Sequence, residues 1–186
     1  MARTESAMLA LGTPAPDFQL PDTISGQTFR YDDIAGDRAT LVMFICNHCP
    51  FVQHVLDQLA QLGHDYAGPD VGLVAISSND VATYPQDSPD KMRELAQDAG
   101  FTFPYLFDES QQVARDFGAV CTPDFFVFDG NRRLAYRGQL DDARPGNGKP
   151  VNGTDLRAAL DALVAGQPVS TDQKPSVGCN IKWKPA

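Results

Sequence analysis

The stretch TLVMFICNHCP, residues 40–50, decides how this chain folds. Its first part, Thr40 to Ile45, carries no charge and is rich in branched and aromatic side chains, which is typical of a strand covered on both faces. Cys46 and Cys49 follow at once, spaced as C-x-x-C. Beyond them, apolar residues at helical spacing predict an amphipathic helix: Phe51, Val52, Val55, Leu56, Leu59 and Leu62.

Strand and helix patterns alternate along the rest of the chain. A hairpin signal, Asp129-Gly130-Asn131, predicts one antiparallel strand pair within this series. Alternation of this kind predicts a layered α/β domain whose parallel sheet has an antiparallel edge. The expected elements are strands at Val71–Ser77, Phe103–Phe107, Phe125–Phe128 and Leu134–Gly138, and helices at Pro89–Ala99, Gln111–Phe117 and from a cap at Thr154 or Asp155 to about Ala165.

We expect residues 1–186 to form a single domain. Its two ends lie outside the series of alternating strands and helices. Short extended pieces and turns over residues 11–35 predict an N-terminal hairpin. Residues 168–186 read as an irregular tail. Because Trp183 is the only tryptophan of the chain, we expect this tail to pack on the domain.

The charge and composition of the chain exclude some classes of binding partner. The formal net charge is -9, and no basic stripe offsets it, so neither nucleic acid nor a membrane surface is an expected partner. No stretch reads as a signal peptide or a membrane span, and we expect a cytoplasmic protein. In that reducing compartment four cysteines do not predict a disulfide scaffold, and a close pair indicates catalysis or metal binding.

The C-x-x-C pair points to thiol-disulfide exchange. At a junction of strand and helix, Cys46 would meet the unpaired N–H groups and the dipole of the helix, so we expect a lowered pKa and an attacking thiolate. Cys49, one turn on, would resolve the mixed disulfide. Asn47 and His48 support the pair, since a protonated His48 would favour the Cys46 thiolate and raise the reduction potential.

Metal binding is the alternative interpretation of the same residues. Cys46, His48 and Cys49 are all ligand types for zinc or copper, and a module holding a metal or sensing redox state through them is a second class of function. However, the sequence has no second C-x-x-C and no H-x-x-H to complete such a site. We therefore expect an enzyme that needs neither a metal nor another cofactor.

Four motifs together resemble one known superfamily: FICNHCP (44–50), AISSND (75–80), CTPDFF (121–126) and GCNIKW (178–183). The chain resembles thioredoxin-fold proteins, and specifically the peroxiredoxin-like proteins of the alkyl hydroperoxide reductase and thiol-specific antioxidant group. The resemblance spans nearly the whole chain. It implies a thioredoxin-like α/β fold, with a central mixed sheet flanked by helices and an N-terminal hairpin extension.

The resemblance also implies a substrate-binding edge. Pro123 would be a cis-proline facing the cysteine pair, and the backbone of Thr122 would hydrogen-bond an incoming extended substrate. Peroxiredoxins place their peroxidatic cysteine where Cys49 stands, but their hydroxyl position holds Cys46 and their arginine position holds Pro123. A thiol peroxidase using Cys49 is therefore only an alternative function.

The two remaining cysteines have open roles. Cys121 is either a third redox thiol beside the cis-proline or a small buried hydrophobe. Cys179, in the tail, either resolves a disulfide or packs, and packing is favoured. The predicted function is a thiol-disulfide oxidoreductase whose partners are a disulfide-containing protein or small-molecule disulfide and a separate reductant.

Overall fold

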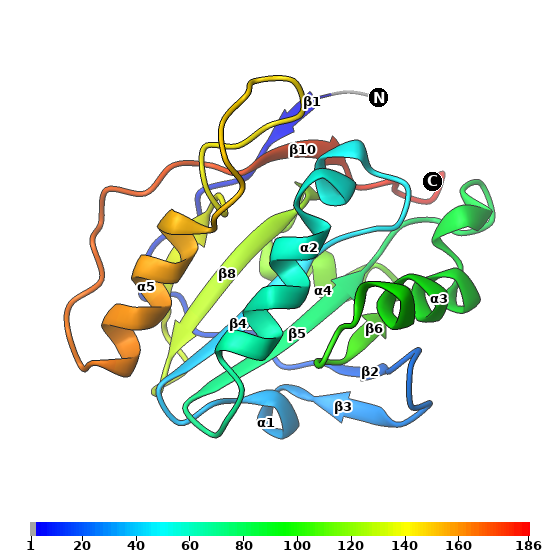
Figure 1. Ribbon diagram of the computed structural model, residues 1–186. Helices are drawn as coiled ribbons and strands as arrows, with labels where there is room; N and C mark the ends of the chain where they lie inside the picture. Colours follow the sequence, from blue (N-terminus) through cyan, green and yellow to red (C-terminus); the bar gives the residue numbers. More distant parts are fainter. Residues whose placement is uncertain (1–2) are drawn as a thin grey trace.

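A five-stranded sheet forms the centre of the protein, whose computed structural model describes residues 3–186. Strand β4 (Ala39–Phe44) runs through its middle (Figure 1). Strands β5 (Val71–Ser77) and β6 (Tyr105–Phe107) extend the sheet in parallel on one side. Strands β8 (Asp124–Asp129) and β9 (Leu134–Gly138) extend it in antiparallel fashion on the other. The sheet is therefore mixed, as the sequence predicts.

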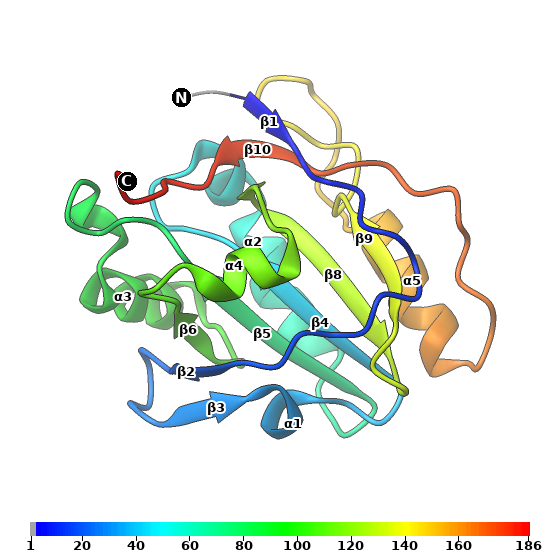
Figure 2. The same cartoon turned by 180° about the vertical axis from the view of Figure 1, so that it is seen from behind.

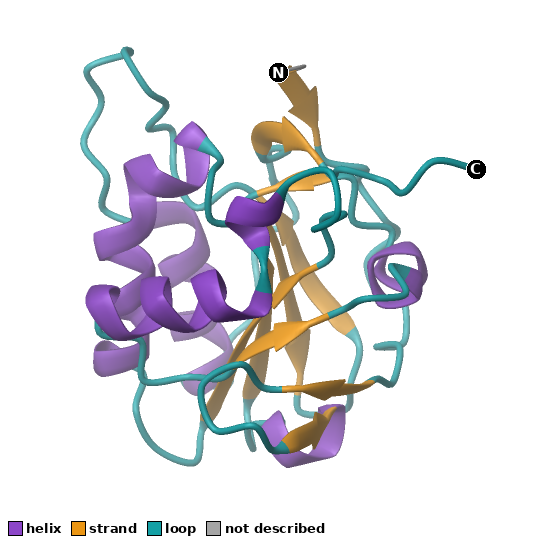
Figure 3. Cartoon of the chain, turned by 90° about the vertical axis from the view of Figure 1, so that its right-hand side faces the viewer, coloured by secondary structure: helices purple, strands orange, loops and turns teal. Residues whose placement is uncertain are grey.

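Helices cover both faces of this sheet. Seen from the side, the long helices lie on one face of the sheet and the short helix α4 (Gln112–Phe117) lies on the other (Figure 3). The back view shows this second face, where the short helix and an N-terminal hairpin cross the strands (Figure 2). The first face carries α2 (Pro50–Asp65), α3 (Pro89–Ala99) and α5 (Thr154–Val164), and the second carries α1 (Tyr31–Ile34), α4 (Gln112–Phe117) and the pair β2 (Gln19–Pro21) and β3 (Thr28–Arg30).

The uncharged character of β4 follows from these two layers. All six residues of the strand are buried, and successive side chains enter opposite cores. Leu41 and Met43 pack under α2, α3 and α5, whereas Val42 and Phe44 pack with the aromatic residues under α4. A central strand with helices on both sides has no solvent face, which excludes the usual alternation of polar and apolar residues.

A second, three-stranded sheet contains the C-terminal segment. Its order is β1 (Arg3–Glu5), β10 (Val177–Asn180) and β7 (Cys121–Thr122), and all pairs are antiparallel. The expectation of an irregular tail is wrong for residues 177–180. The pairing partners of β10 lie at residues 3–5 and 121–122, both distant from it in the sequence, so no local pattern predicts the strand.

Element boundaries agree closely with the predicted ones elsewhere. The bounds of β5, α3 and β9 coincide with the predicted ranges. Helix α5 is capped by Gly153 at a φ of 69°, and not by Thr154 or Asp155 as expected. A short 3-10 helix, η1 (Pro85–Asp87), precedes α3. Within residues 3–186, no helix is both long enough and apolar enough to cross a bilayer.

Candidate active site

The cysteine pair lies in the connection between β4 and α2. The strand ends at Phe44 and the helix begins at Pro50, so Cys49 is the N-cap residue. Proline suits the first helical position, because its missing N–H would be unpaired there in any case. Cys46 therefore lies a full turn before the helix, and the free N–H groups of α2 are directed at Cys49.

The loop around a cis peptide bond closes the site from the other side. The bond between Thr122 and Pro123 is cis, as the resemblance implied. Cys46 Sγ lies 3.5 Å from the hydroxyl oxygen of Thr122, and Cys49 Sγ lies 3.4 Å from its carbonyl oxygen. Both sulfurs thus face the residue before the cis-proline, and both cysteines are at most 1% exposed.

Cys49 holds the favoured thiolate of the pair. Its pKa is lowered to about 5, first because the Cys46 thiol donates a hydrogen bond to its sulfur. Hydrogen bonds from the Cys179 thiol, the backbone N–H of Val52 and the Thr122 side chain act in the same direction, against the effect of burial. A thiolate held by donors of this kind is the nucleophilic form of cysteine.

The prediction of a lowered pKa at Cys46 is wrong. Its pKa is raised because its proton is held in the hydrogen bond to Cys49, because the thiol is buried, and because the charge of Asp87 lies nearby. The prediction placed the helix start at Cys46. Pro50 is the sequence signal for the true start, since proline is enriched at the first position of helices.

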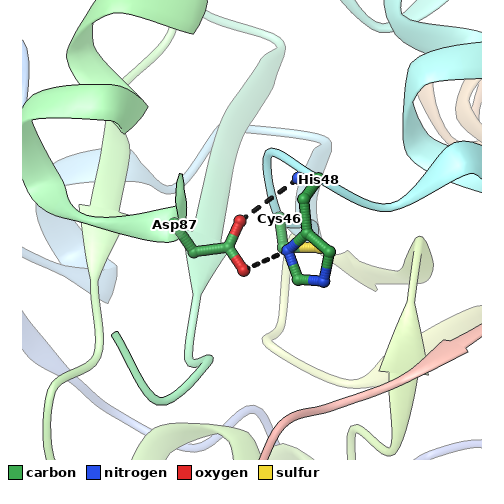
Figure 4. A group of neighbouring side chains, drawn as sticks. All are labelled: Cys46, His48 and Asp87. Carbon is green, nitrogen blue, oxygen red and sulfur yellow. Dashed lines mark hydrogen bonds and ion pairs between the residues drawn. The ribbon is translucent and has the colours of Figure 1, made fainter. Parts of the chain in front are cut away.

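Asp87 is a site residue that the sequence analysis missed. It is fully buried at the end of η1, and its Oδ1 accepts hydrogen bonds from the backbone N–H groups of Asn47, at 2.8 Å, and His48, at 3.2 Å. Its Oδ2 lies 2.5 Å from His48 Nδ1 (Figure 4). The same oxygen accepts a hydrogen bond from the Asn79 side chain. Asp87 therefore fixes the turn between the two cysteines.

Asn47 and His48, the two predicted supporting residues, are held by contacts with residues near Asp87 and with Tyr105. The Asn47 side chain accepts a hydrogen bond from the Tyr105 hydroxyl and donates one to the carbonyl of Gln86. The His48 ring stacks on Tyr84, with centroids 5.4 Å apart and an interplanar angle of 4°. The His48 ring lies between two site groups, because its Nδ1 is 2.5 Å from Asp87 Oδ2 and one of its nitrogens lies within 4.8 Å of Cys46 Sγ.

Cys179 reaches the same place from the C-terminal strand. Its sulfur lies 2.8 Å from Cys49 Sγ, and Cys179 pairs with Thr122 in the register of β10 and β7. Burial and the hydrogen bond to Cys49 raise the pKa of Cys179 to about 12. The backbone edge beside the cis-proline, expected to await a substrate, is therefore occupied by the chain's own strand.

A family model described as the AhpC/TSA family matches residues 11–137. The chain belongs to the AhpC/TSA family. It is 27% identical over 131 residues to the thiol-disulfide oxidoreductase ResA of Geobacillus thermodenitrificans, covering 70% of each chain. The class named there is the one predicted here from the cysteine pair.

Solved structures agree with the predicted fold. The crystal structure of an uncharacterized conserved protein from Geobacillus kaustophilus matches with a TM-score of 0.98 and 54% identity, covering 100% of this chain and 98% of the other. The thioredoxin domain of a thiol-disulfide oxidoreductase from Bacteroides vulgatus matches with a TM-score of 0.61 and 15% identity, covering 73% and 92%. The predicted thioredoxin-like α/β fold is confirmed.

The fourth cysteine of this AhpC/TSA chain, Cys121, is enclosed by the protein. Cys121 is fully buried, and its sulfur lies 3.9 Å from the carbonyl oxygen of Pro123. Burial and the neighbouring Asp124 raise the pKa of its thiol. A protonated, enclosed thiol behaves as a small hydrophobe, although the charges of Cys49 and Cys179 also help to raise the pKa of Cys121.

The ligand types near the pair differ from the set that the sequence suggested. In the part of the chain that the structure describes, Cys46, His48 and Asp87 bring ligand atoms within 4.8 Å of one another (Figure 4). However, His48 Nδ1 and Asp87 Oδ2 are 2.5 Å apart, whereas two such ligands of a tetrahedral zinc ion stand about 3.3 Å apart. The arrangement fits a hydrogen-bonded ion pair better than a preformed metal site.

Proposed function

We propose that this chain is a thiol-disulfide oxidoreductase in which Cys49 carries the attacking thiolate and Cys46 resolves the mixed disulfide. The observation that carries the proposal is the position of Cys49 at the start of α2, where Cys46, Cys179, Thr122 and the Val52 N–H surround its sulfur. The order of attack is the reverse of the one expected from the sequence, because the helix begins at Pro50.

The reaction follows from where the protons lie. The Cys49 thiolate attacks one sulfur of a substrate disulfide, that S–S bond breaks, and the other substrate sulfur leaves as a thiolate. The leaving thiolate takes the proton of Cys46, whose own sulfur then attacks the Cys49 side of the mixed disulfide. The substrate ends reduced by two electrons, and the pair ends as a disulfide.

A separate dithiol must return the pair to its reduced form. By the same exchange, its first sulfur attacks the disulfide and its second releases the dithiol as its own disulfide. We place this cycle in the cytoplasm, where thiols are kept reduced. The substrate class is a protein or small-molecule disulfide, and the net charge of -9 favours partners that are not themselves strongly acidic.

A thiol peroxidase is the second candidate, favoured by the lowered pKa of Cys49. Its weakness lies in the groups around that sulfur. Among residues 3–186, the groups that hydrogen-bond Cys49 Sγ are two thiols, Thr122 and one backbone amide. None of them is cationic, and stabilising the charge that develops as an O–O bond breaks requires a preorganised donor such as a guanidinium.

Steady-state turnover tests the proposal. Reduction of a small aromatic disulfide, with dithiothreitol as the reductant, is measured for the wild type and for Cys46→Ser, Cys49→Ser and Cys121→Ser. We expect Cys49→Ser to fall to the uncatalysed background, Cys46→Ser to turn over more slowly than the wild type because it has lost its resolving thiol, and Cys121→Ser to retain the wild-type rate. A Cys49→Ser variant that turns over normally would overturn the proposal, and fast hydrogen peroxide consumption that depends on Cys49 alone would favour the peroxidase.

A further inference from the structure

We infer that strand β10 occupies the substrate position of its own active site, and that Cys179 is a third redox thiol that exchanges a disulfide with Cys49. This inference rests on the proposed function. It adds Cys179 to the reacting thiols, and it makes β10 a gate, a strand that must move aside before an external disulfide can reach Cys49. The contacts of β10 with the cis-proline loop carry the argument, together with the sulfur geometry.

The first support is the backbone register. Strand β10 pairs antiparallel with β7, with Cys179 opposite Thr122 and Asn180 opposite Cys121. Thr122 precedes the cis-proline and borders both reacting sulfurs. An extended peptide that binds beside the cysteines by strand addition would need this same edge. The chain therefore holds at its own active site what an external peptide substrate would have to present.

The second support is the position of the sulfur within that strand. A bound substrate would place its disulfide sulfur against the attacking thiolate, and Cys179 Sγ lies 2.8 Å from Cys49 Sγ. Cys46, Cys49 and Cys179 are all at most 2% exposed. An external disulfide thus reaches Cys49 only when β10 moves aside, so the strand and the substrate compete for one place.

The third support is how closely the strand lies on the loop. A Cβ atom at Gly178 would collide with the carbonyl group of Thr122, so only glycine permits this approach. Both flanks of β10 are anchored as well. The Ser176 hydroxyl donates a hydrogen bond to the Pro123 carbonyl, and the Lys182 N–H donates one of 2.9 Å to Asn79. A loosely packed tail would show no such set of contacts.

The exchange needs no added oxidant. Starting from the disulfide between Cys46 and Cys49, the Cys179 sulfur attacks Cys49 Sγ, a Cys49–Cys179 bond forms, and the bond to Cys46 breaks. The proton of Cys179 passes to the freed Cys46 sulfur. The same attack on a mixed disulfide between Cys49 and a substrate releases the substrate thiol. In the first case the disulfide stays within the protein and only changes partners. In the second, the substrate sulfur takes the proton of Cys179 and leaves as a thiol, and the protein keeps the disulfide.

Trapping in the absence of Cys46 tests the inference. Cys46→Ser, Cys46→Ser/Cys179→Ser and the matched control Cys46→Ser/Cys121→Ser are incubated with oxidised glutathione and mapped by mass spectrometry without reduction. We expect a Cys49–Cys179 disulfide in the first and third proteins, and a stable glutathione adduct on Cys49 in the second.

The outcomes separate the two claims. A Cys49 adduct as stable in Cys46→Ser as in the Cys179 double variant would overturn the role of Cys179 while leaving Cys49 as the attacking thiol. No reaction at Cys49 in any of the three proteins, under conditions where the denatured chains react, would overturn the proposed function itself. Circular dichroism spectra of the three variants are compared with that of the wild type, so that only folded proteins enter the comparison.

Discussion

Two thiols, a hydroxyl and a backbone amide meet around one atom, Cys49 Sγ. They come from the turn before α2, the helix itself, the cis-proline loop and the C-terminal strand. Each donor stabilises the negative charge of the thiolate, and the enclosed surroundings make each interaction stronger than it would be in water. The reactivity assigned to Cys49 is thus a property of several segments meeting at one residue.

The thiolate of Cys49 gives a measurable pH dependence. Because its pKa is lowered to about 5, Cys49 is ionised at neutral pH and becomes protonated as the pH falls through about 5. We expect the ultraviolet absorbance of thiolate in the reduced protein to be present at neutral pH and to titrate with that midpoint. Cys49→Ser should abolish this transition and Cys121→Ser should leave it intact. A midpoint at the ordinary thiol value of about 8.5 would contradict the assignment.

Asp87 is the second residue on which the account depends, because its charge is fixed beside the turn. Asp87→Asn removes the negative charge that helps to raise the pKa of Cys46. Thiolates in the reduced pair should then be more stable, so we expect the reduction potential to rise by about 30 mV, a tenfold change in the equilibrium constant. Equilibration with glutathione buffers measures this potential.

The control for this variant is Asp90→Asn, at an 87% exposed side chain on the next helix, which should leave the potential unchanged. Asp87→Asn should also lower the free energy of unfolding by about 1–3 kcal/mol, since buried donors lose a charged acceptor. A potential equal to that of the wild type, in a variant destabilised by this amount, would show that Asp87 is only structural.

At the scale of residues, the sequence predicted that the cysteine pair and the cis-proline form a redox site. It did not predict which cysteine has the lowered pKa, nor the part played by Asp87. The C-x-x-C spacing and Thr122-Pro123 are local motifs, and the structure brings them together as expected. Asp87 could not be found this way, because its partners are backbone N–H groups about 40 positions earlier, and only the folded chain brings them into contact. The pKa order was missed because the helix start was misplaced by one turn.

At the scale of elements, β10 is the feature that sets this site apart from an open redox pair. It is a four-residue strand containing a glycine, and its pairing with β7 and β1 brings both ends of the sequence together. Neither propensity nor periodicity predicts such a strand, since its stability comes from its partners. The longer elements were predictable because their apolar patterns repeat over many residues.

Gly178 offers a direct test of the gate. Gly178→Ala adds a methyl group where the Thr122 carbonyl lies, so β10 should be pushed from the cis-proline loop. We expect faster alkylation of Cys49 by iodoacetamide and a smaller yield of the Cys49–Cys179 disulfide. Gly130→Ala is the matched control, because its Cβ would also meet a backbone carbonyl, that of Asp37, far from the site. Equal alkylation rates in the wild type and Gly178→Ala would contradict a gating role for β10.

At the scale of the molecule, two cores hold the site rigid. The cores lie on opposite faces of the central sheet, and the cysteine pair belongs to the one under α2, α3 and α5. The fold class was predictable because β4 carries no charge and because strand and helix patterns alternate around it. The three-stranded sheet that closes the site unites residues near 4, 121 and 179, which no sequence pattern links.

The central claim is that Cys49 undergoes reversible thiol-disulfide exchange. Its most direct test is thiol trapping and mass spectrometry of the wild-type protein across glutathione buffers of graded potential. We expect Cys49 to pass reversibly between thiol and disulfide, bonded to Cys46 or Cys179, near the cytosolic range of roughly -220 to -320 mV. A Cys49 that remains a thiol at every potential, in folded protein, would contradict the account.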